Sequence, residues 1–187
     1  MHSYAKIWEM CIKSKNATNV ENTEKINVFE VNKMRKNIIF ICHGNICRSV
    51  AAQYILQDLV RQQGWESGFQ IDSAAATSEE IGNPIYPPME EELRRRGIPI
   101  GNHRARLLRR EDYDRWDLFI GMNAENMRDM RRILGRDPEK KIHLLMEFAG
   151  KPGQEIEDPW WTERFAAVAD QLEEGCGALL VQYTKGE

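Results

Sequence analysis

Residues 39–53, IFICHGNICRSVAAQ, constrain what this chain can fold into more than any other stretch. They begin inside a short apolar run at 37–42 whose β-branched and aromatic side chains predict a strand buried on both faces. Two cysteines, a Gly-Asn pair and an arginine follow at once, and a helical pattern begins near Ser49. Polar groups crowded between a strand and a helix do little for folding, so this unit indicates a chemical site.

Strand and helix patterns alternate along the rest of the chain. Further strands are predicted at 69–74, 117–122 and 141–146, and helices at about 49–63, 87–97, 124–134 and from an N-cap at Thr162 onward. This alternation predicts an α/β fold, a doubly wound four-stranded parallel sheet with helices on both faces and a phosphate-binding loop after the first strand. In such sheets ligands bind beyond the carboxyl ends of the strands, where the loop of Cys42 lies.

Length and composition favour one domain. The 187 residues predict a domain at 36–187, preceded by a loosely ordered extension at 1–35. A formal net charge of −3 gives no bulk attraction to nucleic acid or to an anionic membrane, and we interpret the arginines at 94–96 as a solvated helix face. The sequence has no apolar window of the roughly 18 residues that a membrane span requires. Four cysteines without a secretory signal predict a reducing, cytoplasmic location.

The loop at 42–48 is suited to binding an anion. Gly44 permits a close backbone approach, and Asn45 tolerates a left-handed conformation that turns amide groups inward. The positive end of the following helix and the planar fork of Arg48 would both favour a phosphate in this loop. The same field favours the thiolate of Cys42, which is the nucleophilic form of cysteine.

Other interpretations of this loop fit less well. Cys42, His43 and Cys47 lack the short-spaced Cys or His partners of a structural zinc site. A nucleotide-binding P-loop would require a Gly-Lys-Ser/Thr sequence that does not follow. Two inert cysteines remain the simplest alternative to a reactive thiol.

Asp158 is the candidate for a general acid. It precedes Pro159 and two tryptophans, and such low-dielectric neighbours favour a protonated carboxyl group. Because Asp-Pro is also a common turn opener, the residues alone leave both roles open.

Residues 42–49, CHGNICRS, resemble the signature of the low-molecular-weight protein tyrosine phosphatases, Cys-x-Gly-Asn-Ile-Cys-Arg-Ser. Four more segments agree in order and spacing: DSA at 72–74, HRAR at 103–106, GMN at 121–123 and DPWW at 158–161. The resemblance, which runs from about residue 37 to the C-terminus, implies a phosphatase that works through a cysteinyl-phosphate without metal or cofactor. It further implies that the substrates are phosphotyrosine-containing proteins or small aryl phosphates, and that oxyanions such as phosphate or vanadate inhibit.

The resemblance also assigns roles position by position. Cys42 would be the nucleophile, Arg48 would hold the phosphoryl oxygens, and Asp158 would be the general acid. The implied substrate-binding residues are His43, Gly44, Asn45, Ile46, Cys47, Ser49, Trp160 and Trp161, and the implied supports of the loop are Asn45, Ser49, Ser73 and His103. Cys47 would either protect Cys42 through a reversible disulfide or serve only as a small buried side chain.

The chain departs from the family pattern at the expected pocket wall. Glu79 stands about where the family has an aromatic or apolar residue, and a glutamate would repel a dianion and offer no ring. Ala75 replaces a glycine, and Val50 and Gln53 replace a proline and a glutamate. Trp160 and Trp161 stand where tyrosines are common, so tyrosine phosphorylation there is excluded.

Three other functions are alternatives to a tyrosine phosphatase. A protein-arginine phosphatase would carry threonine in place of Ile46. An arsenate reductase needs shuttle cysteines, a role that Cys11 in the extension and Cys176 in the last helix do not suit. An inactive phosphate-binding module is disfavoured by the presence of both Cys42 and Asp158.

Overall fold

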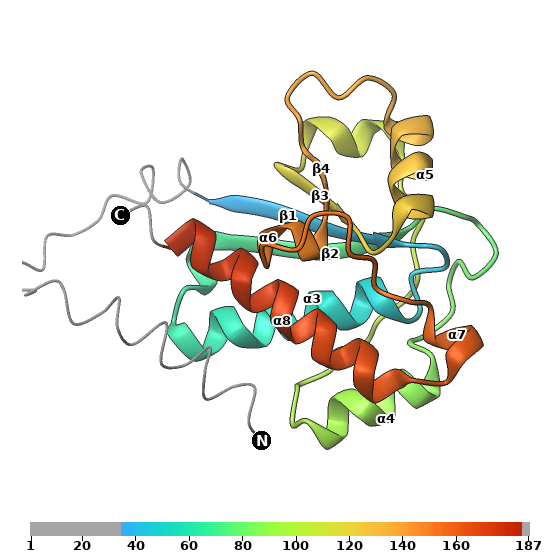
Figure 1. The fold of residues 1–187 in the computed structure, drawn as a ribbon, viewed down its shortest axis with the longest axis vertical. Helices are drawn as coiled ribbons and strands as arrows, with labels where there is room; N and C mark the ends of the chain where they lie inside the picture. Colours follow the sequence, from blue (N-terminus) through green and yellow to red (C-terminus); the bar gives the residue numbers. More distant parts are fainter. Residues whose placement is uncertain (1–34, 185–187) are drawn as a thin grey trace, which may run out of the picture.

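The chain folds around a four-stranded sheet with helices on both faces (Figure 1). The structure, a computed structural model, describes residues 35–184, so nearly all of the predicted extension at 1–35, including Cys11, lies outside the described residues. The strands are β1 (Lys36–Cys42), β2 (Phe69–Ala75), β3 (Leu118–Gly121) and β4 (Ile142–Leu144). All pairings are parallel, in the order β2-β1-β3-β4, which confirms the predicted fold class.

The helices have the following bounds: α3 (Arg48–Gln63), α4 (Pro87–Arg95), α5 (Ala124–Leu134), α6 (Leu145–Phe148), α7 (Pro159–Thr162) and α8 (Phe165–Thr184). Two short 3-10 helices, η1 (Glu66–Gly68) and η2 (Arg110–Asp114), lie before β2 and β3. In the described part of the chain, none of these helices combines the length and the apolarity needed to span a membrane.

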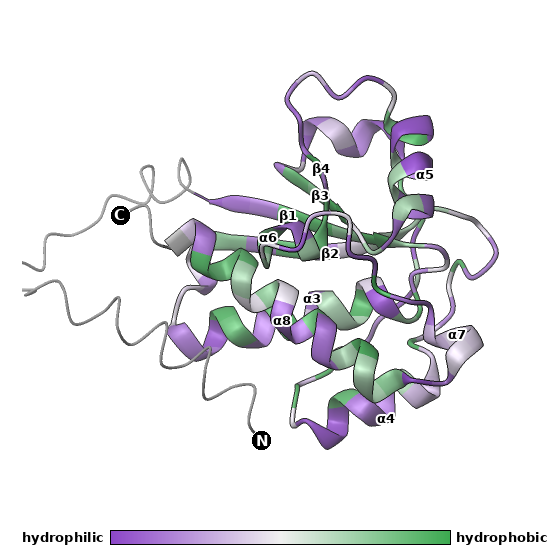
Figure 2. Cartoon of the chain, in the orientation of Figure 1, coloured by the Kyte–Doolittle hydropathy of each residue, from purple (hydrophilic) through white to green (hydrophobic). Residues whose placement is uncertain are grey.

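The central strand β1 separates two cores. Its side chains alternate, so Ile38 and Phe40 pack into the core under α3 and α8, while Ile39 and Ile41 pack into the core under α5. All four side chains are completely buried, as expected for a central parallel strand covered by helices on both faces. Figure 2 shows hydrophobic residues on β3, α3 and α8, interspersed on the two helices with hydrophilic residues. This sandwiching holds the carboxyl end of β1, and with it Cys42, in a fixed place.

Two predicted boundaries near the C-terminus are wrong. The strand expected at 141–146 ends at Leu144, because the chain turns into α6 at Leu145. The last helix does not start from an N-cap at Thr162. Asp158 caps the separate single turn α7, its side chain accepting from the Trp160 N–H, and Glu163 ends that turn in a left-handed conformation (φ 56°).

The arginines at 94–96 are only partly a solvated face. Arg94 and Arg95 are exposed and pair with glutamates on their own helix. Arg96 is 11% exposed and its guanidinium contacts Asp170 and Glu173, so it joins the end of α4 to α8. The expectation of a fully solvated run is therefore wrong for Arg96.

Candidate active site

The loop between β1 and α3 is organised around Asn45, which is completely buried and adopts a left-handed conformation with φ 58°. Its side-chain nitrogen donates to Ser49 Oγ at 3.0 Å and to Ser73 Oγ at 2.8 Å, and its Oδ1 accepts from the Arg106 N–H at 3.1 Å. Its backbone carbonyl accepts from His103 Nε2 at 2.7 Å. The structure thus brings together the four residues expected to support the loop.

The hydroxyl groups of Ser49 and Ser73 extend the hydrogen bonds of Asn45 to further side chains. Ser73 accepts from Asn45 and donates to Gln53 Oε1 at 2.6 Å, so Gln53, seen in the sequence only as a departure, completes this network. Ser49 also accepts from Asn45, which leaves its own hydroxyl hydrogen available to the Cys42 Sγ, 3.0 Å away. The Ser49 hydroxyl is thus placed to donate a hydrogen bond to the Cys42 sulfur.

Burial lowers the pKa of His103 below its ordinary value, while the hydrogen bond to the Asn45 carbonyl opposes that shift. Since the carbonyl can only accept, Nε2 must carry the hydrogen. The neutral Nε2–H form of His103 therefore suffices to hold the loop.

The segment after β2 supports the loop from its other side. Its amide groups donate to three carbonyls of the loop: Ala76 to Cys42 at 2.9 Å, Thr77 to His43 at 3.1 Å, and Tyr86 to Ile46 at 2.7 Å. Gly44 lies under the Glu80 side chain, and a Cβ added there would be 2.7 Å from the Glu80 Cγ. The sequence signals did not reveal this contact, and a side chain at position 44 would force the Glu80 side chain to shift.

Arg48, the first residue of α3, is 2% exposed. Its Nη1 donates to the Ile156 carbonyl at 3.3 Å, and its Nη2 pairs with the Asp158 carboxylate. The Nε–H is buried and has no hydrogen-bond partner within residues 35–184. The guanidinium is thus held from the segment between β4 and α7, and its Nε–H is left for another acceptor.

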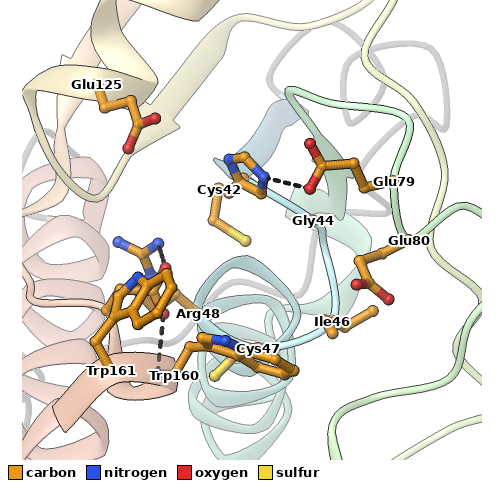
Figure 3. Close-up of a pocket in the computed structure, with 12 residues that line it drawn as sticks. Cys42, Gly44, Ile46, Cys47, Arg48, Glu79, Glu80, Glu125, Trp160 and Trp161 are labelled. Carbon is orange, nitrogen blue, oxygen red and sulfur yellow. Dashed lines mark hydrogen bonds and ion pairs between the residues drawn. The ribbon is translucent and has the colours of Figure 1, made fainter.

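These groups surround a cavity of about 410 Å³ (Figure 3). Its lining residues are Cys42, His43, Gly44, Ile46, Cys47, Arg48, Glu79, Glu80, Glu125, Asp158, Trp160 and Trp161. Asn45 and Ser49 are buried beside them. All the residues predicted for catalysis and substrate binding therefore lie in or directly behind one cavity.

Trp160 and Trp161 line one edge of this cavity. Trp160 is 50% and Trp161 is 82% exposed, and the Trp160 ring packs on Tyr86 with centroids 4.9 Å apart. Glu79 and Glu80 lie across the cavity from these tryptophans (Figure 3). Glu80 and Glu125 are lining residues that the sequence did not single out, although Glu125 follows the carboxyl end of β3, where a site in a parallel sheet is expected.

The two cysteines of the loop differ in their environment. Burial raises the pKa of the Cys47 thiol far above its ordinary value, with smaller contributions of the same sign from Cys42 and Asp158. Cys47 is therefore protonated at neutral pH. Cys42 has the hydroxyl of Ser49 beside its sulfur and is the better candidate for a nucleophile.

Fold and site together define an α/β protein with a Cys-x5-Arg anion-binding loop at the carboxyl end of its first strand. Residues 37–187 match the model of the family described as low molecular weight phosphotyrosine protein phosphatase. The chain belongs to this family, and the resemblance proposed from its motifs is confirmed.

Individual relatives agree with this assignment. The chain is 34% identical over 150 residues to the low molecular weight protein-tyrosine-phosphatase YfkJ of Bacillus subtilis, covering 80% of this chain and 96% of the relative. It is 34% identical over 149 residues to the human low molecular weight phosphotyrosine protein phosphatase, covering 78% and 94%.

Solved structures show the same architecture. The crystal structure of YfkJ from Bacillus subtilis superposes with a TM-score of 0.78 at 33% identity, covering 82% of this chain and 97% of that one. A low molecular weight protein tyrosine phosphatase from Streptococcus pyogenes superposes with a TM-score of 0.70 at 27% identity, covering 79% and 92%.

Proposed function

We propose that this protein is a phosphatase that hydrolyses phosphotyrosine and related aryl phosphates through a cysteinyl-phosphate. One observation carries the proposal: the Cys42 sulfur, the buried Arg48 guanidinium and the Asp158 carboxylate all border the same cavity. This is the set of groups that phosphoryl transfer to a thiolate requires, namely a nucleophile, a clamp for the phosphoryl oxygens and a proton donor.

In the first step, the Cys42 thiolate attacks phosphorus in line and the bond from phosphorus to the phenolic oxygen breaks. Arg48 and the first-turn amide groups of α3, which lack intrahelical partners, hold the equatorial oxygens. Asp158, acting as an acid, gives its proton to the departing oxygen. The products are a cysteinyl-phosphate and a phenol.

In the second step, water attacks the same phosphorus and the sulfur–phosphorus bond breaks. Asp158, now a carboxylate, accepts a proton from the water, and Cys42 leaves as a thiolate. Inorganic phosphate is released. The unpartnered Arg48 Nε–H is a donor suited to the phosphoryl group in both steps.

Aryl phosphates in proteins are the substrate class we propose. The relatives from Bacillus subtilis and human are named as protein-tyrosine and phosphotyrosine phosphatases, respectively. The rings of Trp160 and Trp161 at the edge of the cavity are suited to packing against a phenyl ring. The apolar Ile46 side chain in the cavity wall is also suited to this contact. A relay of the arsenate-reductase kind is not favoured, because Cys176 is completely buried in α8.

The proposal extends to organisation and location. We propose that residues 36–187 carry the whole activity, so a chain that starts at residue 36 would keep the kcat of the full chain. We also propose a cytoplasmic location, because a mechanism through the Cys42 thiolate needs a reducing compartment. The partnership of Cys47 with Cys42 under oxidation stays a prediction.

A substrate panel tests the proposed function. We expect the full chain to release phosphate from a phosphotyrosine peptide, vanadate to block this release, and Cys42→Ser to lower it to the background rate. Phosphoarginine and arsenate, assayed with and without thiol, should be poor substrates. Preferred turnover of phosphoarginine or arsenate, or full activity of the serine variant, would contradict the proposal.

A further inference from the structure

The Glu79 carboxylate contacts the imidazole ring of His43, a residue of the catalytic loop. His43 Nε2 lies 3.0 Å from Glu79 Oε2, and both residues line the cavity. Glu79 occupies the position at which the sequence suggested a missing wall residue. Although glutamate offers no ring of its own, the structure shows that it binds the imidazole of His43.

The contact is one of three that a single segment makes to His43. Thr77, two residues before Glu79, donates to the His43 carbonyl from its backbone N–H at 3.1 Å and from its Oγ1 at 3.3 Å. The backbone of His43 is thus fixed by Thr77, and Glu79 fixes the direction of its side chain. The His43 side chain is 38% exposed and that of Glu79 is 68% exposed, so the hydrogen bond to Glu79 is the contact that orients the ring.

The chemistry of the pair determines which atom donates. A carboxylate only accepts, so Nε2 of His43 must carry its hydrogen. A glutamine at position 79 would still offer an oxygen to that hydrogen, whereas an alanine would offer nothing. These two substitutions therefore separate the hydrogen bond from the charge of Glu79.

We propose that Glu79 is a positioning residue that holds the His43 imidazole as a wall of the cavity, across from Trp160 and Trp161, and that this wall selects a planar aryl group on the phosphate. The inference rests on the proposed function for the identity of the phosphate ester. Figure 3 supports the placement, since Glu79 lies on the side of the cavity away from the tryptophans. A flat substrate ring would then pass between aromatic surfaces, which favour offset or edge-to-face packing.

Electrostatics must be separated from this packing effect. The carboxylates of Glu79, Glu80, Glu125 and Asp158 border the cavity, as do Arg48, His43, Cys42 and Cys47. Removing the Glu79 charge would by itself strengthen the binding of any dianion. Phenylphosphonate and methylphosphonate carry the same anionic group, so the ratio of their dissociation constants cancels the charge effect and reports the contact with the ring.

The test is calorimetric binding of these two phosphonates to the full chain. We expect Glu79→Ala to lower the preference for phenylphosphonate about three- to tenfold, the range of one aromatic contact, and Glu79→Gln to keep it within about twofold. His43→Ala should match Glu79→Ala, and the double variant should lose no more. In kinetics with p-nitrophenyl phosphate, Glu79→Ala should change KM and leave kcat within about twofold.

The His143–Glu147 pair provides a matched control. Its nitrogen and oxygen are 3.3 Å apart, and neither residue lines the cavity, so His143→Ala and Glu147→Ala should not change the preference. Additive losses in the Glu79 and His43 double variant, or an unchanged preference in Glu79→Ala, would overturn the inference. Because binding is measured without turnover, failure of the proposed phosphatase activity would be seen separately, in the substrate panel.

Discussion

Arg48 and Asp158, which are 110 residues apart in the chain, form an ion pair that joins the first turn of α3 to the N-cap of α7. The arginine is 2% exposed and the aspartate side chain 26% exposed. The phosphate clamp and the carboxyl group proposed as the proton donor are therefore in contact. Because an arginine partner favours the ionised form of a carboxyl group, Asp158 can give a proton only after this ion pair has opened.

Replacing Asp158 should slow the reaction without abolishing it. Loss of a general acid costs ~10²–10⁴ in rate, so kcat of Asp158→Ala should fall by about that factor with phenyl phosphate. The decrease should be smaller with p-nitrophenyl phosphate, because p-nitrophenolate is a better leaving group and depends less on protonation. Glu157→Ala is the neighbouring control, since Glu157 pairs with Arg164 and does not line the cavity. Equal decreases for the two esters would contradict the assigned role.

Asn45 should be critical for both stability and the shape of the loop. Asn45→Ala removes two donated and one accepted side-chain hydrogen bond, each costing about 1–3 kcal/mol when the partner stays buried. It also forces alanine into the left-handed region, at a cost of roughly 1–2 kcal/mol. We expect a total loss of several kcal/mol in the free energy of unfolding measured with urea. Asn45→Gly should recover about the backbone part of that loss, and equal stability of the two variants would argue against strain at this position.

His103 makes stability depend on pH. Because burial lowers its pKa in the folded state, the unfolded chain binds more protons below the ordinary histidine pKa of about 6.5. The contribution of His103 is therefore complete above that pH and is lost as the pH falls through the folded-state pKa. We expect the free energy of unfolding to fall more steeply between pH 7 and pH 5 in the wild type than in His103→Gln, which keeps a donor for the Asn45 carbonyl. One proton limits this difference to about 1.4 kcal/mol per pH unit, and parallel curves would refute the proposed linkage.

Gly175 should be intolerant of any side chain. A Cβ at this position would lie 2.5 Å from the Leu145 Cγ, where α8 packs on α6. Overpacking of this kind costs about 1–3 kcal/mol, so Gly175→Ala should lower the free energy of unfolding by that amount. A Cβ on Gly68 meets no atom within 4 Å, which makes Gly68→Ala the control. Similar stabilities for the two alanine variants would show that α8 can move away from α6.

The sequence is sufficient to predict the helices and strands that have a strong hydrophobic pattern. The apolar run that became β1 and the pattern that became α5 were predicted to within one residue, because burial on a sheet or against a core leaves a clear period. Short elements were harder. The sequence pattern does not predict α7, because a four-residue helix has no periodicity of its own. The pattern also places the start of α8 too early, at Thr162, because it does not show that Glu163 ends α7 in a left-handed backbone conformation.

The candidate site was predictable where chemistry and motif coincide. Cys42, Arg48 and Asp158 were singled out by residue type, local sequence and resemblance, and the structure places them around one cavity. Contacts made through backbone groups, such as the Arg106 N–H to Asn45, leave no mark in residue type. The pairing of Glu79 with His43 depends on how two loops meet, which local sequence does not determine.

The central claim is that Cys42 carries the phosphoryl group between the two steps. The direct measurement is a single turnover of Asp158→Ala with p-nitrophenyl phosphate, quenched rapidly and mapped by peptide mass spectrometry. The account predicts one phosphate on the peptide that contains Cys42, formed at the rate of p-nitrophenol release and absent in Cys42→Ser. A phosphate on any other residue, or nitrophenol release with no phosphorylated peptide at any time, would contradict it.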